Sequence, residues 1–152
     1  MKDERIFTRD FTLDMMISLC CSLNYFTLLI NITGFAAFRF GSDTAIGGTA
    51  AGIYVIGGLL SRIVAGKYIE MVGRKKVLLI GLSFALVMST TYFFVSSIAM
   101  LMAIRFLHGM SYGISSTCTS DIVAKLLPQS RRGEGLGYFF LSITIACAIG
   151  PL

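Results

Sequence analysis

Apolar residues in this chain come in long blocks, and the short segments between the blocks hold most of the charged residues. A helix that crosses a bilayer needs about 20 predominantly apolar residues. Blocks of this length predict four complete spans, and a fifth block predicts a span that is cut off at the last residue of the sequence. In chain order the predicted spans are residues 11–38, 44–65, 77–96, 98–127 and 135–152.

Because only an α-helix satisfies every backbone polar group within one segment, these blocks predict an all-α, polytopic membrane helix bundle. The composition agrees: 55% of the residues are hydrophobic and 14% are charged, against roughly 25% charged residues in average soluble domains. The second span is rich in glycine, and Gly109 and Gly113 form a small-xxx-small pair in the fourth. Such residues allow helix backbones to approach closely in a membrane. We therefore expect the lipid bilayer to be the solvent of this chain.

The connections between the spans alternate between basic and nearly uncharged. The first-to-second connection contains only Arg39 and Asp43 as charged residues, and the third-to-fourth contains Ser96 and Ser97. Lysine and arginine are retained on the cytoplasmic side of a membrane. The sequence therefore predicts an integral protein of the plasma (cytoplasmic) membrane with a cytoplasmic N-terminus. The basic residues on that side are Lys2, Arg5, Arg9, Lys67, Arg74, Lys75, Lys76, Lys125, Arg131 and Arg132.

Several classes of function are excluded by the pattern. The net charge of +5 follows the membrane pattern rather than a basic face with interleaved aromatic residues, so no nucleic-acid partner is expected. The four cysteines lie in apolar stretches without a CxxC motif, which predicts neither disulfides nor a metal site. One histidine supplies no catalytic triad and no metal-ligand set, so an enzyme is not expected.

Residues 66–76, between the second and third spans, read Gly-Lys-Tyr-Ile-Glu-Met-Val-Gly-Arg-Lys-Lys. They resemble the cytoplasmic signature G-x-L-x-D-x-x-G-R-[RK]-[RK] of the major facilitator superfamily, at the place where that family carries it. Glu70 stands where the family usually has Asp, and Tyr68 stands where it has an aliphatic residue. The matching residues are Gly66, Gly73, Arg74, Lys75 and Lys76.

This resemblance implies a cluster of charges that gates the cytoplasmic side. Glycine permits the backbone angles of a tight turn between two helices. A carboxylate at Glu70 can pair with Arg74 and face the positive end of a neighbouring helix. In the family an acidic residue at the end of helix four joins the carboxylate and the arginine, and Asp121 matches it. The alternatives are a loop that is basic only for orientation, and an exposed Asp121 that offsets Lys125.

Residues 105–109, Arg-Phe-Leu-His-Gly, resemble the arginine and glycine of helix four in proton-coupled family members. A charge inside the bilayer is costly and marks a functional site by default, so Arg105 is predicted to act in proton coupling. It lies on the outer part of its helix, about 24 Å from Asp121, and could instead extend to the outer interface. For His108, a hydrogen-bonded interior position is favoured over a role as proton carrier.

The fifth block ends in Ile-Gly-Pro at residues 149–151. This resembles the antiporter motif in helix five of drug and metabolite efflux members, with Gly150 and Pro151 at its centre and Ala146 where a glycine is often found. Proline removes a helical hydrogen bond and kinks the helix. The resemblance therefore implies a hinge at Gly150 and Pro151, and it favours export over uptake.

Family members have about twelve helices in two halves, and this chain resembles the N-terminal half, with the C-terminal half missing. The resemblance implies a secondary carrier that exports a small-molecule substrate by alternating access. The proton gradient supplies the energy, and no cofactor is expected. The alternatives are an uptake porter for sugars or organic anions, and a non-transporting fragment or assembly protein of four or five spans. The predicted cavity residues are Asn24, Tyr25, Asn31, His108 and Ser111.

Overall fold

The structure is a computed structural model, and it describes residues 5–151. All regular structure in this part is helical, which confirms the all-α prediction. Two residues named in the sequence analysis, Lys2 and Leu152, lie outside the described residues. The elements are α1 (Arg9–Phe40), α2 (Thr44–Val72), α3 (Arg74–Thr91), the 3-10 turn η1 (Tyr92–Phe94), α4 (Ile98–Leu126), the 3-10 turn η2 (Gln129–Arg131) and α5 (Arg132–Ile149).

Four segments in the described part of the chain are long and apolar enough to cross a membrane: α1, α2, α3 together with η1, and α4. The helix α2 does not stop where its apolar block ends at residue 65, but continues to Val72. Gly66 and Glu70 consequently lie inside a helix rather than in a loop. The turn to α3 is made by Gly73 alone, whose φ of 97° is a left-handed value that glycine tolerates. Gly66 therefore takes no part in this turn.

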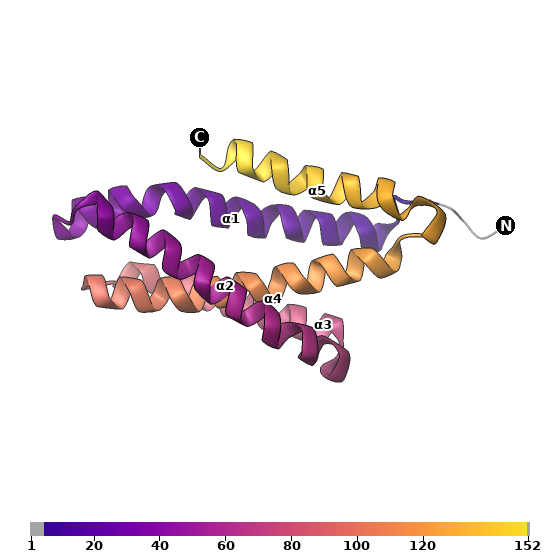
Figure 1. Cartoon of the computed structure of the whole chain (residues 1–152), viewed down its shortest axis with the longest axis horizontal. Coiled ribbons are helices and arrows are strands. Elements are labelled where there is room, and N and C mark those ends of the chain that lie inside the picture. The colour runs from indigo at the N-terminus through magenta and orange to yellow at the C-terminus, as the bar shows by residue number, and fades with distance from the viewer. Residues whose placement is uncertain (1–4, 152) are drawn as a thin grey trace.

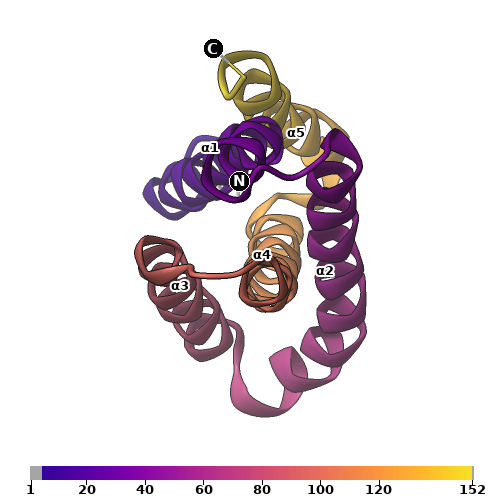
Figure 2. The same cartoon turned by 90° about the vertical axis from the view of Figure 1, so that its left-hand side faces the viewer.

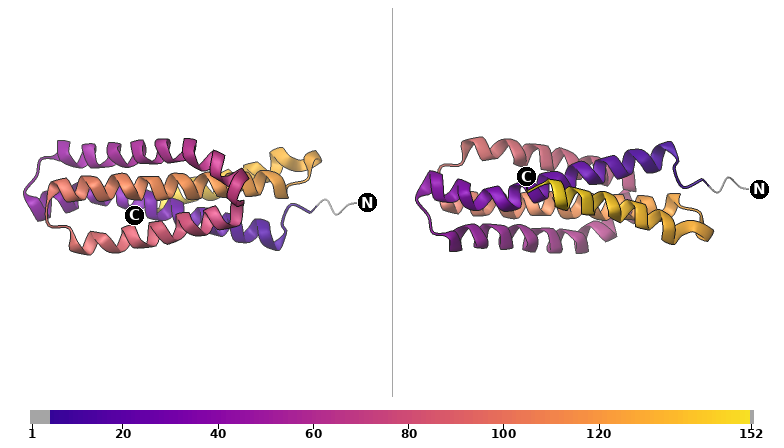
Figure 3. Two further views of the ribbon diagram at one scale, coloured as in Figure 1. Left: turned by 90° about the horizontal axis from the view of Figure 1, so that it is seen from below. Right: turned by 90° about the horizontal axis from the view of Figure 1, so that it is seen from above.

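Consecutive helices run in opposite directions (Figure 1). The first described residues, the α2–α3 turn and the α4–α5 connection therefore gather at one end of the bundle, which we call the basic end. The α1–α2 and α3–α4 connections lie at the opposite end. The two further views show an elongated bundle whose helices run close to its long axis (Figure 3).

The helix α4 occupies the middle of the bundle, with α1, α2 and α3 around it (Figure 2). In its apolar 18-residue stretch 44% is buried inside the bundle, compared with 17% for the corresponding stretches of α1 and of α3 together with η1. The helix α5 packs mainly on α1. Residues on the faces of α4 that contact its neighbours are thus shielded from lipid. We therefore expect an interior site to include residues of this helix.

Glycines hold α2 against α4, the most extensive helix contact of the bundle. A Cβ atom on Gly57 would collide with the backbone carbonyl of Phe106, and one on Gly109 would collide with the backbone of Tyr54. A Cβ on Gly113 would meet the carbonyl of Gly58. The two backbones are therefore in van der Waals contact, as small residues permit in membrane helices. This contact fixes Tyr54 beside the residues of α4 that follow Ile104.

Candidate functional site

Arg105 is the most deeply enclosed charged side chain of the described residues, with no exposed surface. Its Nε donates to the Ala50 carbonyl at 3.2 Å, and its guanidinium carbon lies 4.4 Å from the centre of the Tyr54 ring. The two terminal nitrogens are buried beside Tyr92 without a hydrogen bond of good geometry in the described part of the chain. A carbonyl and an aromatic face thus solvate the cation. The alternative that Arg105 extends to the outer interface is wrong.

His108 lies one turn further along α4 and is 2% exposed. Its Nδ1 is 3.2 Å from the Tyr92 hydroxyl, within hydrogen-bond distance. Its ring meets the Tyr54 ring edge to face, with 5.5 Å between the centroids. Tyr54, Arg105 and His108 are buried, and together with the half-buried Tyr92 they form one group from α2, η1 and α4. We call this group the arginine–tyrosine cluster. His108 is hydrogen-bonded in the interior, as the sequence favoured.

A cavity of about 220 Å³ lies against this cluster. Asn24, His108 and Ser111 line it together with Tyr54, Tyr112 and Ser115. Three of the five predicted cavity residues therefore meet here.

A second cavity, of about 160 Å³, is lined by Tyr25, Tyr54, Gly58, Arg62 and Tyr112. Tyr54 and Tyr112 line both cavities and separate them. Tyr25 is thus also brought to a cavity, whereas Asn31 lies outside both. The amide of Asn31 instead donates to the Thr27 carbonyl of its own helix at 2.8 Å.

Stacked tyrosines connect three helices at the wall between the cavities. The ring of Tyr25, from α1, lies 5.2 Å from the ring of Tyr54 at an interplanar angle of 28°. The same ring lies 5.1 Å from Tyr112 of α4 at 18°, and Tyr54 and Tyr112 are 6.1 Å from each other. Because Tyr54 is also held under Arg105, the stack is anchored to the arginine–tyrosine cluster.

A different arrangement occupies the basic end. Arg74, the first residue of α3, forms an ion pair through Nε with Oδ2 of Asp121 on α4. Lys125 adds a second ion pair to the same oxygen at 3.3 Å. We call Arg74, Asp121 and Lys125 the ion-pair cluster. Its side chains remain 31% to 49% exposed.

Glu70 does not belong to this cluster. Within residues 5–151 it forms no ion pair, and its side chain is exposed. The helix α2 continues through Val72, so Glu70 lies in its last turn, before the turn at Gly73 that leads to Arg74. The predicted pairing of Glu70 with Arg74 is therefore wrong, whereas Asp121 does contact Arg74. Lys75 is exposed beside Arg74.

Gly150 and Pro151 lie at the end of α5. The Gly150 N–H donates to the Ala146 carbonyl at 2.8 Å. A Cβ atom on Gly150 would come within 2.7 Å of Phe26 Cβ on α1, so the two helices are in close contact here. Pro151 is exposed. The hinge at these residues stays a prediction.

Two ionisable groups inside the spans were not among the predicted site residues. Asp14 of α1 is 4% exposed, and its Oδ2 has no hydrogen-bond partner in the described part of the chain. Arg62 of α2 lines the second cavity. The rule that singled out Arg105, a charge inside an apolar span, would have found both. No comparable signal marks Tyr54 and Tyr112, since an aromatic residue in an apolar helix looks the same whether it faces lipid or the interior.

The residues that the structure describes contain no group of three histidine, cysteine, aspartate or glutamate side chains that could hold a metal ion. All four cysteines are free thiols.

The family model described as Major Facilitator Superfamily matches residues 15–152, nearly the whole chain. The chain belongs to the major facilitator superfamily. It is therefore an integral membrane protein of a transporter family, and not an enzyme. The membership accords with four candidate spans and with a cavity among α1, α2, α3 and α4.

Similar proteins include an uncharacterized MFS-type transporter of Mycobacterium tuberculosis, 31% identical over 82% of this chain. Multidrug resistance protein 1 of Bacillus subtilis is 29% identical over 72% of the chain. A probable anion transporter 6, chloroplastic, of Arabidopsis thaliana is 24% identical over 87%. The matched regions cover 21%, 28% and 26% of these relatives, so the chain spans about a fifth to a quarter of their length.

Proposed function

We propose that this chain forms the first helices of a secondary carrier that exports a small molecule in exchange for protons. Membership of the transporter superfamily supports the carrier. Export is supported by the Gly-Pro pair at the end of α5 and by two similar proteins of Bacillus subtilis named multidrug resistance proteins 1 and 3. In this proposal the basic end is cytoplasmic, because lysine and arginine concentrate there, and the protein resides in the plasma membrane.

The ion pair between Arg74 and Asp121 is the observation that carries the proposal. It joins the first residue of α3, directly after the α2–α3 turn, to α4 at the basic end of the bundle. Exposed ion pairs contribute about 0–1 kcal/mol each, so such a contact can break within one transport cycle. The ion-pair cluster thus has the strength of a gate rather than of a permanent clamp.

The arginine–tyrosine cluster has the properties of a proton-coupling element. Arg105 is a fixed cation in the interior, close to a histidine and to the Tyr92 hydroxyl. A buried cation lowers the cost of a negative charge nearby, because electrostatic interactions are strong where water is excluded. In the proposal Arg105 therefore promotes release of a proton from an acid that enters the cavity. That acid belongs either to the substrate or to a second set of helices.

A second set of helices is part of the proposal. In this family the substrate site lies between two halves, and the relatives extend far beyond the region that matches this chain. The cavities beside Tyr54 would then form one half of a larger site.

The experiment uses the complete reading frame that contains this chain in its gene, expressed and assayed in inverted membrane vesicles. A pH gradient is imposed, and its collapse is followed by a fluorescent indicator while cationic, neutral and anionic compounds are added. We expect at least one compound to collapse the gradient. Arg105→Ala should abolish this effect. Arg39→Ala, which removes an exposed arginine from the last turn of α1, should preserve it.

Three results would count against the proposal. Transport that ignores the pH gradient would favour an uptake porter. Equal loss of activity in the Arg105 and Arg39 variants would remove the special role of the buried arginine. A frame that stops at residue 152 and yields no flux would leave a non-transporting membrane protein.

A further inference from the structure

Arg62 places a charge inside the apolar block of α2. This block ends at residue 65, although α2 continues as a helix to Val72. Arg62 therefore lies about 4.5 Å along the helix axis inside the basic end of the block. A charge within an apolar span is costly and marks a candidate site of ion or substrate binding.

The structure gives Arg62 little to bind. Within residues 5–151 no carboxylate pairs with it. Its one hydrogen bond there runs from Nη2 to the Ser116 hydroxyl, at the long distance of 3.5 Å. A guanidinium carries five N–H donors and keeps its charge at every relevant pH. Most of the donors of Arg62 are thus available to a ligand, in contrast to Arg105, which is enclosed by protein.

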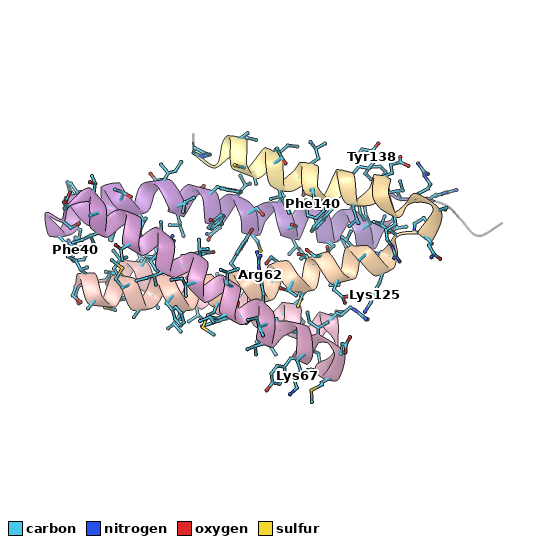
Figure 4. The ribbon with its side chains drawn as sticks, viewed as in Figure 1. Phe40, Arg62, Lys67, Lys125, Tyr138 and Phe140 are labelled. Carbon is cyan, nitrogen blue, oxygen red and sulfur yellow. The ribbon has the colours of Figure 1, made fainter. Side chains whose placement is uncertain are left out.

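The surroundings of Arg62 are aromatic and ordered. Its side chain reaches from α2 into the space between α1 and α4 (Figure 4), and it lines the 160 Å³ cavity. Tyr25 and Tyr112 present stacked rings to the same cavity. Tyr54 lines the same cavity and is held by the cation above its face. A flat aromatic wall therefore stands beside a guanidinium with free donors.

We propose that Arg62, Tyr25 and Tyr112 bind a small aromatic anion, an organic acid of one or two rings. The acid group would accept two parallel hydrogen bonds from Arg62, the geometry in which arginine binds carboxylates and sulfonates. The ring would stack on the tyrosine faces, which favour offset aromatic contacts.

This inference rests on the proposed function and gives its substrate a chemical class. An anion alone cannot cross the hydrocarbon core cheaply. A fixed cation beside the cavity neutralises it during the crossing. The two arginines are thus assigned different tasks: Arg62 contacts the acid group, and Arg105 sets the electrostatic potential behind the tyrosine wall.

The test is an equilibrium binding measurement on the complete protein, purified in lipid nanodiscs, with radiolabelled benzenesulfonate as the probe. This anion stays charged over the usable pH range, and benzenesulfonamide is its neutral counterpart. We expect Arg62→Gln to weaken benzenesulfonate binding by about 10- to 100-fold, and Arg62→Lys to weaken it less because the charge remains. Benzenesulfonamide should bind weakly and equally to all variants.

The matched control is Lys67→Gln, which removes a cation from the same helix. Lys67 is exposed and points away from the bundle near the basic end (Figure 4). We expect the affinity of Lys67→Gln for benzenesulfonate to be unchanged. Size-exclusion profiles of all variants verify that the protein remains folded, which is expected since Arg62 is exposed in this bundle.

Absence of benzenesulfonate binding, or equal binding by wild type and Arg62→Gln, would overturn the inference. So would an Arg62→Gln protein that fails to fold or loses transport of cationic and neutral compounds, because Arg62 would then pair with an acid of the second half. Proton-driven export of such compounds without anion binding would leave the proposed function intact and remove only the substrate class. Anion binding without any flux would leave the inferred anion site intact and remove the proposed transport function.

Discussion

Arg105 lies toward the end of the bundle opposite the basic end, whereas Arg74 lies at the basic end. Their surroundings differ in burial and in partners. Arg105 has no exposed surface and is held by a backbone carbonyl and a tyrosine ring. Arg74 keeps 40% of its side chain exposed and is held by one carboxylate. The neighbours of Arg105 also lie on a helix contact where glycine backbones touch, whereas Arg74 sits beside a turn.

The difference separates a fixed element from a switchable one. A cation enclosed by packed backbone cannot leave without opening the α2–α4 contact, so its removal leaves a void and unsatisfied groups. An exposed ion pair is compensated by water when it breaks, and therefore costs little. We infer that changes near Arg105 affect folding strongly, and that changes near Arg74 affect which end is open more than whether the protein folds.

The largest effect is expected for Gly109→Leu. The side chain would have to occupy the position of the Tyr54 backbone, so α2 and α4 must separate. We expect the free energy of unfolding to fall by at least about 3 kcal/mol, measured by thermal unfolding in detergent. The matched variant is Gly66→Leu in α2 near the basic end, where a Cβ meets nothing within 4 Å. Equal destabilisation by both variants would contradict the proposed contrast.

Arg105→Ala is expected to have the next largest effect. The truncation leaves a void above the Tyr54 ring and costs about 2–4 kcal/mol of stability, whereas Arg39→Ala should cost less than about 0.5 kcal/mol. Arg105→Met refills the volume without the charge and should recover most of the loss, because replacing a buried charge by an apolar side chain is often neutral. Thermal unfolding of the three variants measures this. A stable Arg105→Ala protein would show that the cluster is not close-packed.

Some of the features in this comparison were predictable from the sequence. The blocks of apolar residues predicted the all-α bundle, because in a membrane backbone hydrogen bonding forces each block into a helix. The small-xxx-small pair at Gly109 and Gly113 indicated a close helix contact. Arg105 was singled out because a charge in an apolar block is rare. These features depend on local composition, which the sequence displays directly.

The details that depend on which way a helix faces were not predictable. Glu70 was expected to pair with Arg74 because the two residues are close together in the motif. However, α2 continues as a helix past Glu70, and the Glu70 side chain is exposed. Asn31 looked like a cavity residue by its polarity, yet it is satisfied by the carbonyl one turn earlier. Tyr54 and Tyr112 gave no signal, because their role depends on rings contributed by other helices.

A smaller effect on stability, but a clear effect on opening, is expected for Asp121→Asn. Loss of the ion pair with Arg74 removes about 1 kcal/mol from the closed basic end, which raises the open population about five-fold. Cys118, which is fully buried one turn before Asp121, reports this opening. In a protein with Cys118 as its one cysteine, the rate of maleimide labelling should rise about five-fold. Glu134→Gln, which breaks an exposed pair local to α5, should leave the rate unchanged.

The smallest effect is expected for Lys125→Gln. Lys125 and Asp121 lie on the same helix, four residues apart, and such exposed pairs contribute about 0.3–0.5 kcal/mol. Because this pair stays within α4, breaking it does not free the α2–α3 turn. We expect Lys125→Gln to change Cys118 labelling by less than about two-fold, whereas Arg74→Gln should match Asp121→Asn. If Lys125→Gln opens the basic end as much as Arg74→Gln does, net positive charge around Asp121 closes it. The closure would then not depend on the contact between α3 and α4, and the gate would have to be redefined as an electrostatic effect of the whole basic end.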